Sequence, residues 1–572
     1  MDRCLAIPEI IHLICDGIRR EGSGSKTLVQ IACVSRTWSD IALDSLWYKI
    51  TGMDRLIRCM PWELWLTATM FHHKKLILNR PIKISDLQLL EKYAPRVRVF
   101  HYRDTFNRFG AFGIKIPQWV QQAFFLSAHH PILPNLKEPH WAMCKSDITP
   151  FLRFFLNDRL EDLQLCIDIT RMEQVYFLAF LPVLCPAISQ LELTLSNRVH
   201  DNDLGDQIQD FTVPLCGWRY LTSLVITDTT LDGLLCIAMM PNLKLLGIED
   251  ARSIWRPSKS KTEGQASLLN ELRGLEAPFS ALQSLGVGTN EPALVITNFI
   301  RVLRNAKLSK IRISLNSELD SEGDLEDLFI ALGEHCDHAS LKSIRFFHSE
   351  SHLSPGFSVL EPLLQFTALQ SVDIDSSWDS WGLMLSKTEA AKIASAWPDV
   401  HTLSLTPDAK TPHFTLLVLL RLAKCTKLRH LSFALDASDP IARRALRDDP
   451  NLFKGVRNYS LRHLTIGKGS PISHKEFVAR FLSGVFLNLD GIVWEGCGAR
   501  APEDVYAKRW MYVSRVLLPL LGRVRRKWCG SEGLVRPLKN SAREWAGKVE
   551  DDDGDWSDEQ NLGKWLNGVD LN

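Results

Sequence analysis

The densest group of potential metal ligands in the chain is the run His335, Cys336, Asp337 and His338. Imidazole, thiolate and carboxylate groups all bind zinc, but a structural zinc site needs a second ligand group at a characteristic spacing. No second group stands at that spacing, and the run falls between a helical pattern and the strand pattern that begins at Leu341. We therefore predict that the chain holds no metal.

Catalytic motifs with a recognisable spacing do not occur in the sequence. The phosphate-binding Gly-x-x-x-x-Gly-Lys loop, the Gly-x-Ser-x-Gly nucleophile elbow and the kinase loop set are all missing. Serine, histidine and carboxylate side chains are plentiful, but no spacing joins them into a triad. The sequence predicts no catalytic residues, no cofactor and no enzymatic activity, with an enzyme of unrecognised type as the least favoured alternative.

The composition is that of an ordinary soluble globular protein. Of 572 residues, 45% are hydrophobic and 23% are charged, and the formal net charge is +1. So small a net charge gives no field that would attract nucleic acid or an anionic membrane. No apolar run approaches the roughly 20 residues of a membrane span, no secretory signal opens the chain, and the 13 cysteines form no Cys-x-x-Cys pair. We expect a cytoplasmic or nuclear location, or both, with no nucleic-acid or membrane partner.

The first fifty residues carry the pattern of a docking module. Ile10, Ile11, Leu13 and Ile14 are predicted to share one side of a helix that Pro8 opens. A second apolar helix follows a flexible connector of glycine and serine, and two tryptophans of the kind enriched at interfaces stand near the end. So short a module cannot bury all of its apolar surface. We expect its remaining apolar face to bind another protein, with a helical cap on the following domain as the alternative.

This segment resembles an F-box over roughly residues 4–50. The resemblance rests on Ile7-Pro8-Glu9, on Val34-Ser35-Arg36 with Trp38, and on the final Leu46-Trp47. Because an F-box docks on a Skp-type adaptor, the resemblance implies that role for the module. The implied adaptor-binding residues are Pro8, Ile10, Ile14, Val34, Trp38, Leu46 and Trp47.

One apolar pattern recurs from residue 160 onward, with apolar residues at a first position and again three and five positions later. The alternation of the last two positions predicts a strand with one buried face. The triplets are Leu160/Leu163/Leu165, Ile188/Leu191/Leu193, Leu221/Leu224/Ile226, Leu243/Leu246/Ile248, Leu282/Leu285/Val287, Leu308/Ile311/Ile313, Leu341/Ile344/Phe346, Leu369/Val372/Ile374, Val400/Leu403/Leu405, Leu428/Leu431/Phe433, Leu461/Leu464/Ile466 and Leu489/Ile492/Trp494.

Independent support comes from the position eight residues after the first apolar residue, where leucine-rich repeats place Asn or Cys. Small hydrogen-bonding residues stand there in most units, where they can satisfy the turning backbone. These residues are Asp168, Ser196, Thr229, Asn290, Asn316, Ser349, Ser377, Asp408, Asp436 and Cys497. Two degenerate earlier units are predicted at Ala94/Val97/Val99 and at Leu136/Pro139/Trp141, although proline is unfavourable in a central strand.

Helical stretches separate the strands, one of them opened by a predicted capping box at Ser473-x-x-Glu476. A strand plus a helix per unit predicts an α/β fold, an all-α F-box module followed by a curved leucine-rich-repeat solenoid. The predicted domains are the F-box-like module at 1–50, a linking helical region with a degenerate first repeat at 51–135, the solenoid at 136–500 with an insertion at about 250–265, a terminal helix or cap at 501–530 and an acidic flexible tail at 531–572.

Residues that alternate with the buried ones along each strand should point onto the concave face of the solenoid. Basic side chains gather there in two predicted strands, acidic ones in the next, and histidines in two later strands. These candidate target-binding residues are Lys310, Arg312, Arg345, Asp373, Asp375, His430 and His463. A peptide of a target protein could use them, and ordinary solvation of the face is the alternative.

An F-box-like head followed by irregular leucine-rich repeats is similar to fungal, basidiomycete-type F-box proteins, and the stretch Tyr93-Ala94-Pro95-Arg96-Val97-Arg98 adds to the likeness. The resemblance implies the substrate-recognition subunit of a Skp–cullin–F-box ubiquitin ligase. Its partners would be a Skp-type adaptor, through it a cullin, and an unknown protein target. A scaffold that binds the adaptor without serving a ligase is the alternative.

Overall fold

A computed structural model gives the fold of the chain. It describes residues 7–21, 24–70, 73–103, 114–115, 118–127, 131–142, 149–167, 172–195, 215, 217–251, 274–275, 278–303, 306–317, 322–348, 356–376, 385–405, 414–448, 456–467, 470–489, 491–494 and 505–522. The chain divides into two compact units, Met1–Glu350 and Ser351–Asn572. The predicted acidic tail at 531–572 and nearly all of the insertion predicted at about 250–265 lie outside the described residues.

The first unit opens with three helices that pack on one another. They are α1 (Pro8–Arg20), α2 (Gly24–Ala32) and α3 (Arg36–Trp47). Pro8 suits the first turn of α1 because its φ is fixed near the helical value, and the Ser35 hydroxyl caps α3 by accepting the Trp38 N–H at 3.3 Å. The core of this helix module consists of Ile11, Cys15, Leu28, Ile41 and Ala42.

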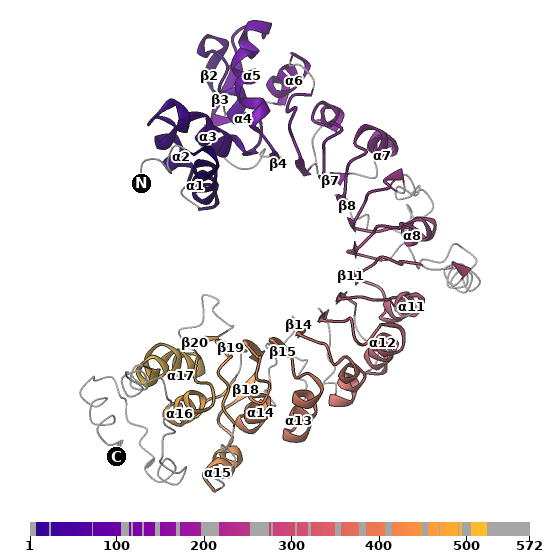
Figure 1. Cartoon of the computed structure of the whole chain (residues 1–572), viewed down its shortest axis with the longest axis vertical. Coiled ribbons are helices and arrows are strands. Elements are labelled where there is room, and N and C mark those ends of the chain that lie inside the picture. The colour runs from indigo at the N-terminus through magenta and orange to yellow at the C-terminus, as the bar shows by residue number, and fades with distance from the viewer. Residues whose placement is uncertain are drawn as a thin grey trace. The chain divides into compact units, whose positions relative to one another are not determined.

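A parallel sheet forms the body of the first unit. Its strands are β1 (Lys49–Thr51), β4 (Val99–Arg103), β6 (Glu138–Ala142), β7 (Asp162–Ile167), β8 (Gln190–Leu195), β9 (Ser223–Ile226), β10 (Leu245–Ile248), β11 (Ser284–Thr289), β12 (Lys310–Leu315) and β13 (Ser343–His348), paired in that order. The helices of the repeats cover one face of this sheet, and among the described residues no repeat helix lies over its other face (Figure 1).

The elements between these strands are mostly helical. They are α4 (Asp54–Ile57), the 3-10 helices η2 (Trp62–Leu64) and η3 (Ile84–Leu87), α5 (Gln88–Tyr93), the 3-10 helix η4 (Ala94–Arg96), α6 (Gln118–Ser127), the 3-10 helix η6 (Thr149–Phe154), α7 (Met172–Leu184), α8 (Leu231–Ala238), α11 (Leu294–Val302) and α12 (Glu322–His335). The region 51–135, predicted to be a helical link, also holds a separate sheet of β2 (Trp65–Met70), β3 (His73–Leu78) and β5 (Ile114–Lys115). This sheet was not predicted, because its strands lack the leucine-rich spacing.

The second unit repeats the strand-and-helix plan. Its parallel strands are β14 (Ser371–Ser376), β15 (Thr402–Leu405), β17 (His430–Phe433), β19 (His463–Ile466) and β20 (Gly491–Trp494), and the short strands β16 (Phe414–Thr415) and β18 (Leu435–Asp436) pair separately. Its helices are the 3-10 helix η8 (Phe357–Gln365), α13 (Lys387–Ala396), α14 (Leu416–Leu422), α15 (Pro440–Asp448), α16 (Lys475–Val485), α17 (Val505–Tyr512) and the π-helix η11 (Val513–Leu517).

Helix starts in the second unit differ from the predicted ones. The capping box predicted at Ser473 and Glu476 is wrong, since α16 begins at Lys475 after His474, which makes no side-chain cap. A true capping box opens α13, where Ser386 and Glu389 each accept the backbone N–H of the other, at 3.3 and 2.6 Å.

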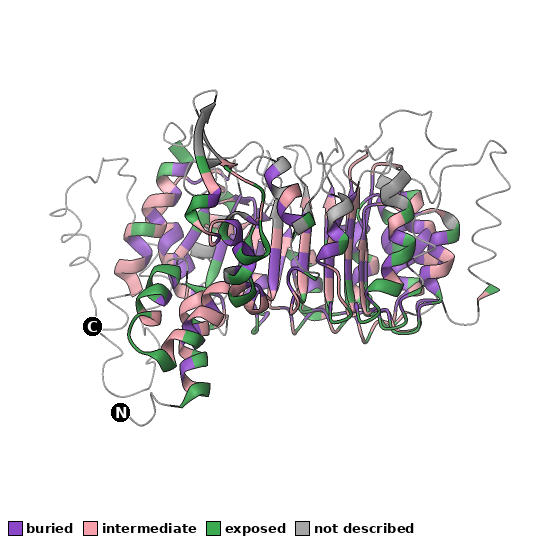
Figure 2. Ribbon diagram, turned by 90° about the horizontal axis from the view of Figure 1, so that it is seen from above, coloured by how far each residue is buried: buried purple, intermediate pink, exposed green. Residues whose placement is uncertain are grey.

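The predicted apolar triplets from Leu160 onward are confirmed as buried positions, except that Leu489 is half-buried. Leu163 and Leu165 of β7 are 0% and 3% exposed, and in β20, the last strand, Ile492 and Trp494 are still only 9% and 8% exposed. Alternate residues of each strand therefore point toward the helices and form the core. Figure 2 shows the buried residues running along the strands and the adjoining sides of the helices.

The first repeat has a different register from the predicted one. Phe100 of β4 pairs with Pro139 of β6, and Tyr102 pairs with Trp141. The first triplet is therefore Val97/Phe100/Tyr102, and the predicted Ala94/Val97/Val99 is wrong by three residues. Aromatic residues stand where later strands carry leucine, so the leucine-rich pattern points to the neighbouring aliphatic residues instead. Pro139 is tolerated because the pairing of β6 with β7 begins one residue later, at His140.

The predicted polar positions after the strands are described in four repeats. In two of these repeats the side chain makes a hydrogen bond to residues near the end of a strand. Asp436 accepts the Ser438 N–H at 2.8 Å, and Asn290 donates to the Asp250 carboxylate at 2.7 Å. Thr229 is 1% exposed, and Asn316 is half-buried. Outside the described residues lie Asp168, Ser196, Ser349, Ser377, Asp408 and Cys497.

Candidate functional site

Helix α1 is apolar on two opposite sides. Ile11 and Cys15 are both 0% exposed and belong to the core of the helix module. Leu13, two residues from each, is 73% exposed, because a helix turns by about 100° per residue and carries Leu13 to the opposite side. Ile10 and Ile14 flank Leu13 and are half-buried. The prediction that Ile11 shares a side with Ile10, Leu13 and Ile14 is therefore wrong, and the other three form a partly exposed stripe.

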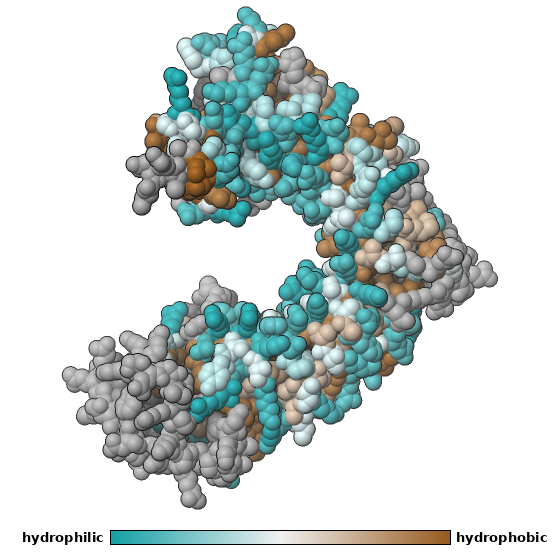
Figure 3. Space-filling model, in the orientation of Figure 1, coloured by the Kyte–Doolittle hydropathy of each residue, from teal (hydrophilic) through white to brown (hydrophobic). Residues whose placement is uncertain are grey.

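Further apolar residues of the module are exposed to solvent. Ile7 is 42% exposed, Val29 of α2 is 49% exposed, and Val34, between α2 and α3, is 75% exposed. Figure 3 shows strongly hydrophobic colour over the α1 and α2 end of the first unit. The residues that we call the apolar surface of the helix module are Ile7, Ile10, Leu13, Ile14, Val29 and Val34. Apolar residues gathered at a surface mark interaction sites more often than scattered ones do.

The start of α2 lies close against the end of α1. A Cβ atom on Gly24 would lie 1.8 Å from the Ile18 carbonyl oxygen, so only glycine allows the start of α2 to approach the end of α1 so closely. The Gly24 N–H also donates to the Glu21 carbonyl at 3.1 Å. The two helices are thereby held in contact.

The predicted adaptor-binding residues separate into two groups. Pro8 and Val34 are exposed, and with the half-buried Ile10 and Ile14 of the partly exposed stripe they are accessible to a partner. Trp38 and Leu46 are partly buried against the module's own core. Sequence reasoning left Leu13 and Val29 out of the set, although their exposure could have been inferred once Ile11, Cys15 and Leu28 were recognised as core.

Trp47, a predicted adaptor contact, is half-buried and packs within the chain. Its indole stacks on the ring of Tyr93 in α5, with centroids 4.8 Å apart and planes 22° from parallel. This contact joins the last residue of α3 to the segment that leads into β4. Trp47 therefore connects the helix module to the first repeat, where a large aromatic contact stabilises the junction.

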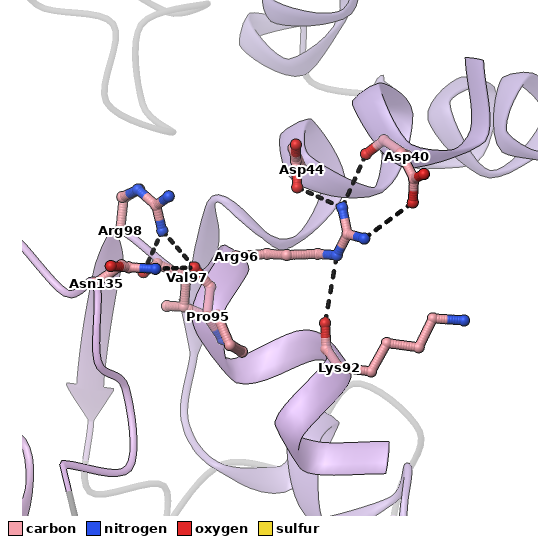
Figure 4. A network of polar contacts seen from close by, with 8 residues as sticks. All are labelled: Asp40, Asp44, Lys92, Pro95, Arg96, Val97, Arg98 and Asn135. Atoms are coloured by element: carbon pink, nitrogen blue, oxygen red, sulfur yellow. Dashed lines mark hydrogen bonds and ion pairs between the residues drawn. The ribbon is translucent and has the colours of Figure 1, made fainter. Parts of the chain in front are cut away.

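Arg96 makes a second connection at the same junction (Figure 4). Its guanidinium donates to the Asp40 carboxylate at 3.0 Å and to the Asp40 carbonyl at 2.9 Å, and it pairs with the Asp44 carboxylate. Its Nε donates to the Lys92 carbonyl at 3.3 Å. The Arg96 side chain is only 18% exposed, so α3 is fixed to η4 by a largely buried arginine.

The carbonyl of Pro95 is the third element of the junction. It accepts from Arg98 Nη1 at 2.6 Å and from Asn135 Nδ2 at 2.8 Å. The stretch Tyr93 to Arg98 thus contacts α3 through Tyr93 and Arg96, and the loop before β6 through Pro95. The sequence marked this stretch as a family feature without indicating that it joins two parts of the chain.

The candidate target-binding residues all lie on the predicted side of their strands. Lys310, Arg312 and Arg345 are exposed in the first unit, where Arg312 and Arg345 are register partners on β12 and β13. Of the second-unit candidates, Asp373 and Asp375 are half-exposed on β14 and the exposed His430 and His463 are register partners on β17 and β19. The basic and acidic strips that the sequence placed side by side therefore belong to different units.

The two histidines of the second unit form a stacked pair. The rings of His430 and His463 lie with centroids 4.8 Å apart and planes 13° from parallel. Burial, and then the proximity of His463 and Arg429, lower the pKa of His430. The folded chain therefore favours the neutral form of His430, because burial disfavours its charged form and the nearby positive charge adds to that effect.

The run of potential metal ligands at the end of α12 contributes to local structure. His338 makes a hydrogen bond through Nε2 to the Gly333 carbonyl at 2.6 Å, and the buried Cys336 has a pKa raised to about 12 by burial. Within the described part of the chain, no three His, Cys, Asp or Glu side chains converge on a point where a metal ion could bind.

Comparison with known proteins gives little likeness. No family model matches this chain, and no curated protein sequence matches it. The chain is similar to a chain in the crystal structure of the Rad7 and Elc1 complex in yeast, at 14% sequence identity and a TM-score of 0.35, over 61% of this chain and 80% of that chain. A likeness at this score is too weak to support a function. Among the described residues, no helix is long and apolar enough to cross a membrane.

Proposed function

We propose that this chain is the substrate-recognition subunit of a Skp–cullin–F-box ubiquitin ligase. In this proposal the helix module docks on a Skp-type adaptor, which connects it to a cullin. The strand faces of the repeats bind a target protein, and the chain itself supplies no chemistry. It would act by raising the effective concentration of target lysines near the ubiquitin-conjugating enzyme.

The observation that carries the proposal is the two-sided α1. Ile11 and Cys15 already fill the module's core, yet Leu13 is 73% exposed and Val34 is 75% exposed. A module of about fifty residues gains little stability from apolar side chains that stay in water. Their presence is explained if a partner covers them, and the F-box resemblance of this segment names the kind of partner.

The junction with the first repeat also fits a delivery role. Trp47 stacks on Tyr93, and Arg96 binds Asp40 and Asp44, so the helix module cannot swing freely about the first strand. A subunit that presents a bound target to an enzyme gains from such rigidity, because flexibility lowers the effective concentration of the reacting groups.

Adaptor binding is tested with the double variant Leu13→Glu/Val34→Glu. Both side chains are mostly in solvent, so the helix module should keep its fold while its apolar surface loses affinity for the adaptor. Ile441→Glu is the matched control, since Ile441 on α15 is 74% exposed and lies in the other unit. Pull-down of a purified Skp-type adaptor should fail with the double variant and persist with the control. Equal binding of the adaptor by the native chain, the double variant and the control would overturn the proposal.

A second experiment separates a ligase subunit from a scaffold. A complex of this chain, adaptor, cullin and ubiquitin-conjugating enzyme is reconstituted with a protein captured from cells in which the proteasome is inhibited. A ligase subunit should promote ubiquitin transfer to that protein, and the Leu13→Glu/Val34→Glu variant should not. Adaptor binding without any transfer would favour the scaffold.

A further inference from the structure

Five strands of the first unit place five residues in one row on the face opposite the helices. Strand pairing sets Glu192 beside Val225, Val225 beside Gly247, Gly247 beside Gly286, and Gly286 beside Arg312. None of the five belongs to the buried positions of its strand. The row is therefore acidic at one end, basic at the other and nearly without side chains in the middle.

The two glycines are notable because a strand interior disfavours glycine. Glycine in such a position is less stable than alanine, because it loses more conformational freedom on folding. Gly288, in the same strand as Gly286, is explained by the fold, since its Cβ would lie 2.2 Å from the Glu249 carbonyl oxygen. Gly247 is explained in part, because its Cβ would lie 3.2 Å from a Val225 methyl group.

Gly286 has no such explanation within the described chain. A Cβ atom there would meet its nearest neighbours, the Gly247 Cα and the Leu246 carbonyl oxygen, at 3.8 and 3.9 Å, which is ordinary contact. Its φ also lies outside the left-handed region that favours glycine. A glycine that neither packing nor backbone geometry requires often marks a place where another backbone comes close.

The two ends of the row carry opposite charge. Lys310 and Arg312 are exposed on β12, and Arg345 is the register partner of Arg312 on β13. At the other end, Asp162 on β7 lies near Glu192 and Glu138, and burial followed by the repulsion of these two carboxylates raises its pKa against the opposing effect of His140. Opposite charges at the two ends would orient a bound segment that carries both signs.

We propose that this strand face binds an extended segment of a partner protein that crosses Gly247 and Gly286. The bound segment places an acidic side chain against Lys310 and Arg312 and a basic side chain against Glu192. This inference names the chemistry of the target within the proposed function and rests on it.

The geometry of the sheet sets the spacing of the two charges in the segment. Neighbouring strands lie about 4.8 Å apart, so the four steps from β8 to β12 span about 19 Å. An extended chain advances about 3.3 Å per residue, so the basic and acidic residues of the segment are about six positions apart.

The test uses the full chain and a displayed library of random twelve-residue peptides. Selection should enrich peptides with a basic and an acidic residue about six positions apart, and the strongest is synthesised with a fluorescent label. Its affinity should fall by at least about tenfold for Lys310→Glu/Arg312→Glu, because the repulsion of like charges replaces their attraction. The matched control Arg219→Glu, exposed before β9 and outside the row, should bind the peptide as the native chain does.

Gly286→Val tests the close approach at the centre of the row. Gly286→Val should lower the affinity for the labelled peptide more than Gly286→Ala does. Circular dichroism should show that both variants stay folded, since the site has room for a Cβ atom. Selection of peptides with one sign of charge only, or equal affinity of the labelled peptide for all variants, would overturn this inference. Adaptor binding is measured in the same preparations. If the chain binds the peptide but not the adaptor, the proposed function is contradicted while the inference about the strand face is still supported.

Discussion

The Trp47 indole at the end of α3 stacks on the Tyr93 ring at the end of α5, with centroids 4.8 Å apart. Together with Arg96, this contact fixes the helix module against the strand that opens the repeats. Trp47 therefore cannot serve as a simple probe of partner binding, since its removal would loosen the junction as well. The exposed Leu13 and Val34 test the partner surface without disturbing this contact.

Replacing Arg96 should loosen the junction without unfolding the repeats. Arg96→Gln removes the ion pairs with Asp40 and Asp44, of which the first is mostly solvated, so we expect a local loss of about 1 kcal/mol. This corresponds to amide hydrogen exchange about fivefold faster in α3, measured by mass spectrometry. Arg20→Gln, at the exposed end of α1, should leave the exchange of α3 unchanged. Unaltered exchange in Arg96→Gln would show that the ion pairs do not hold the junction.

Cysteine labelling should distinguish the partner surface from the core. Cys33 is exposed next to Val34, whereas burial raises the pKa of Cys185 and Cys336 to about 12 and that of Cys425 to about 11. A bulky maleimide should therefore modify Cys33 in the native protein and leave the three buried thiols intact, as peptide mapping can show.

The Cys33 adduct should also block adaptor binding, because it would stand on the apolar surface of the helix module. Cys33→Ser serves as the control, since it should bind the adaptor and keep that binding after maleimide treatment. Full adaptor binding by the labelled native chain would place the docking surface elsewhere.

Asn458 should be important for the stability of the second unit. It is 0% exposed, and its amide donates to the carbonyls of Ala423 and Cys425 at 3.2 and 2.7 Å while its oxygen accepts the N–H groups of Ser460 and Leu461. Asn458→Ala would leave these buried groups unpaired, at a cost of about 3 kcal/mol. Chemical denaturation monitored by circular dichroism measures the loss.

A matched asparagine provides the comparison for that variant. Asn488 donates to the Tyr459 carbonyl at 2.7 Å in an exposed position, where water can replace the bond. Asn488→Ala should therefore cost no more than about 0.5 kcal/mol. Similar losses for the two variants would mean that burial of Asn458 does not determine its contribution.

The second unit should lose stability in mild acid. The pKa of His430 is lowered in the folded chain, so the unfolded chain binds its proton more readily and folding stability falls as the pH drops through the ordinary histidine value of about 6.5. Calorimetric melts between about pH 7.5 and 5.5 should show this loss. His430→Gln should reduce it, and His12→Gln in the exposed part of α1 should not. An unchanged pH dependence in His430→Gln would assign the loss to other groups.

The strands of the repeats and their buried faces could be predicted from the sequence from Leu160 onward. Burial on one side of a strand demands apolar residues at alternate positions, so the triplets from Leu160 to Trp494 indicated which strands would form and which faces would be buried. The same alternation placed Lys310, Arg312 and His430 on the outer face. The prediction failed at Val97, where aromatic residues replace leucine, and at β2 and β3, whose strands lack the leucine-rich spacing.

Which apolar residues remain available to a partner was decided only by the tertiary structure. Ile11 and Leu13 are equally apolar in the sequence, but the packing of α2 and α3 buries the first and leaves the second in solvent. The sequence also did not indicate that Trp47, a predicted docking residue, packs on Tyr93 far along the chain. The row from Glu192 to Arg312 likewise exists only because parallel pairing aligns residues of five strands, and that register depends on contacts between residues distant in the sequence.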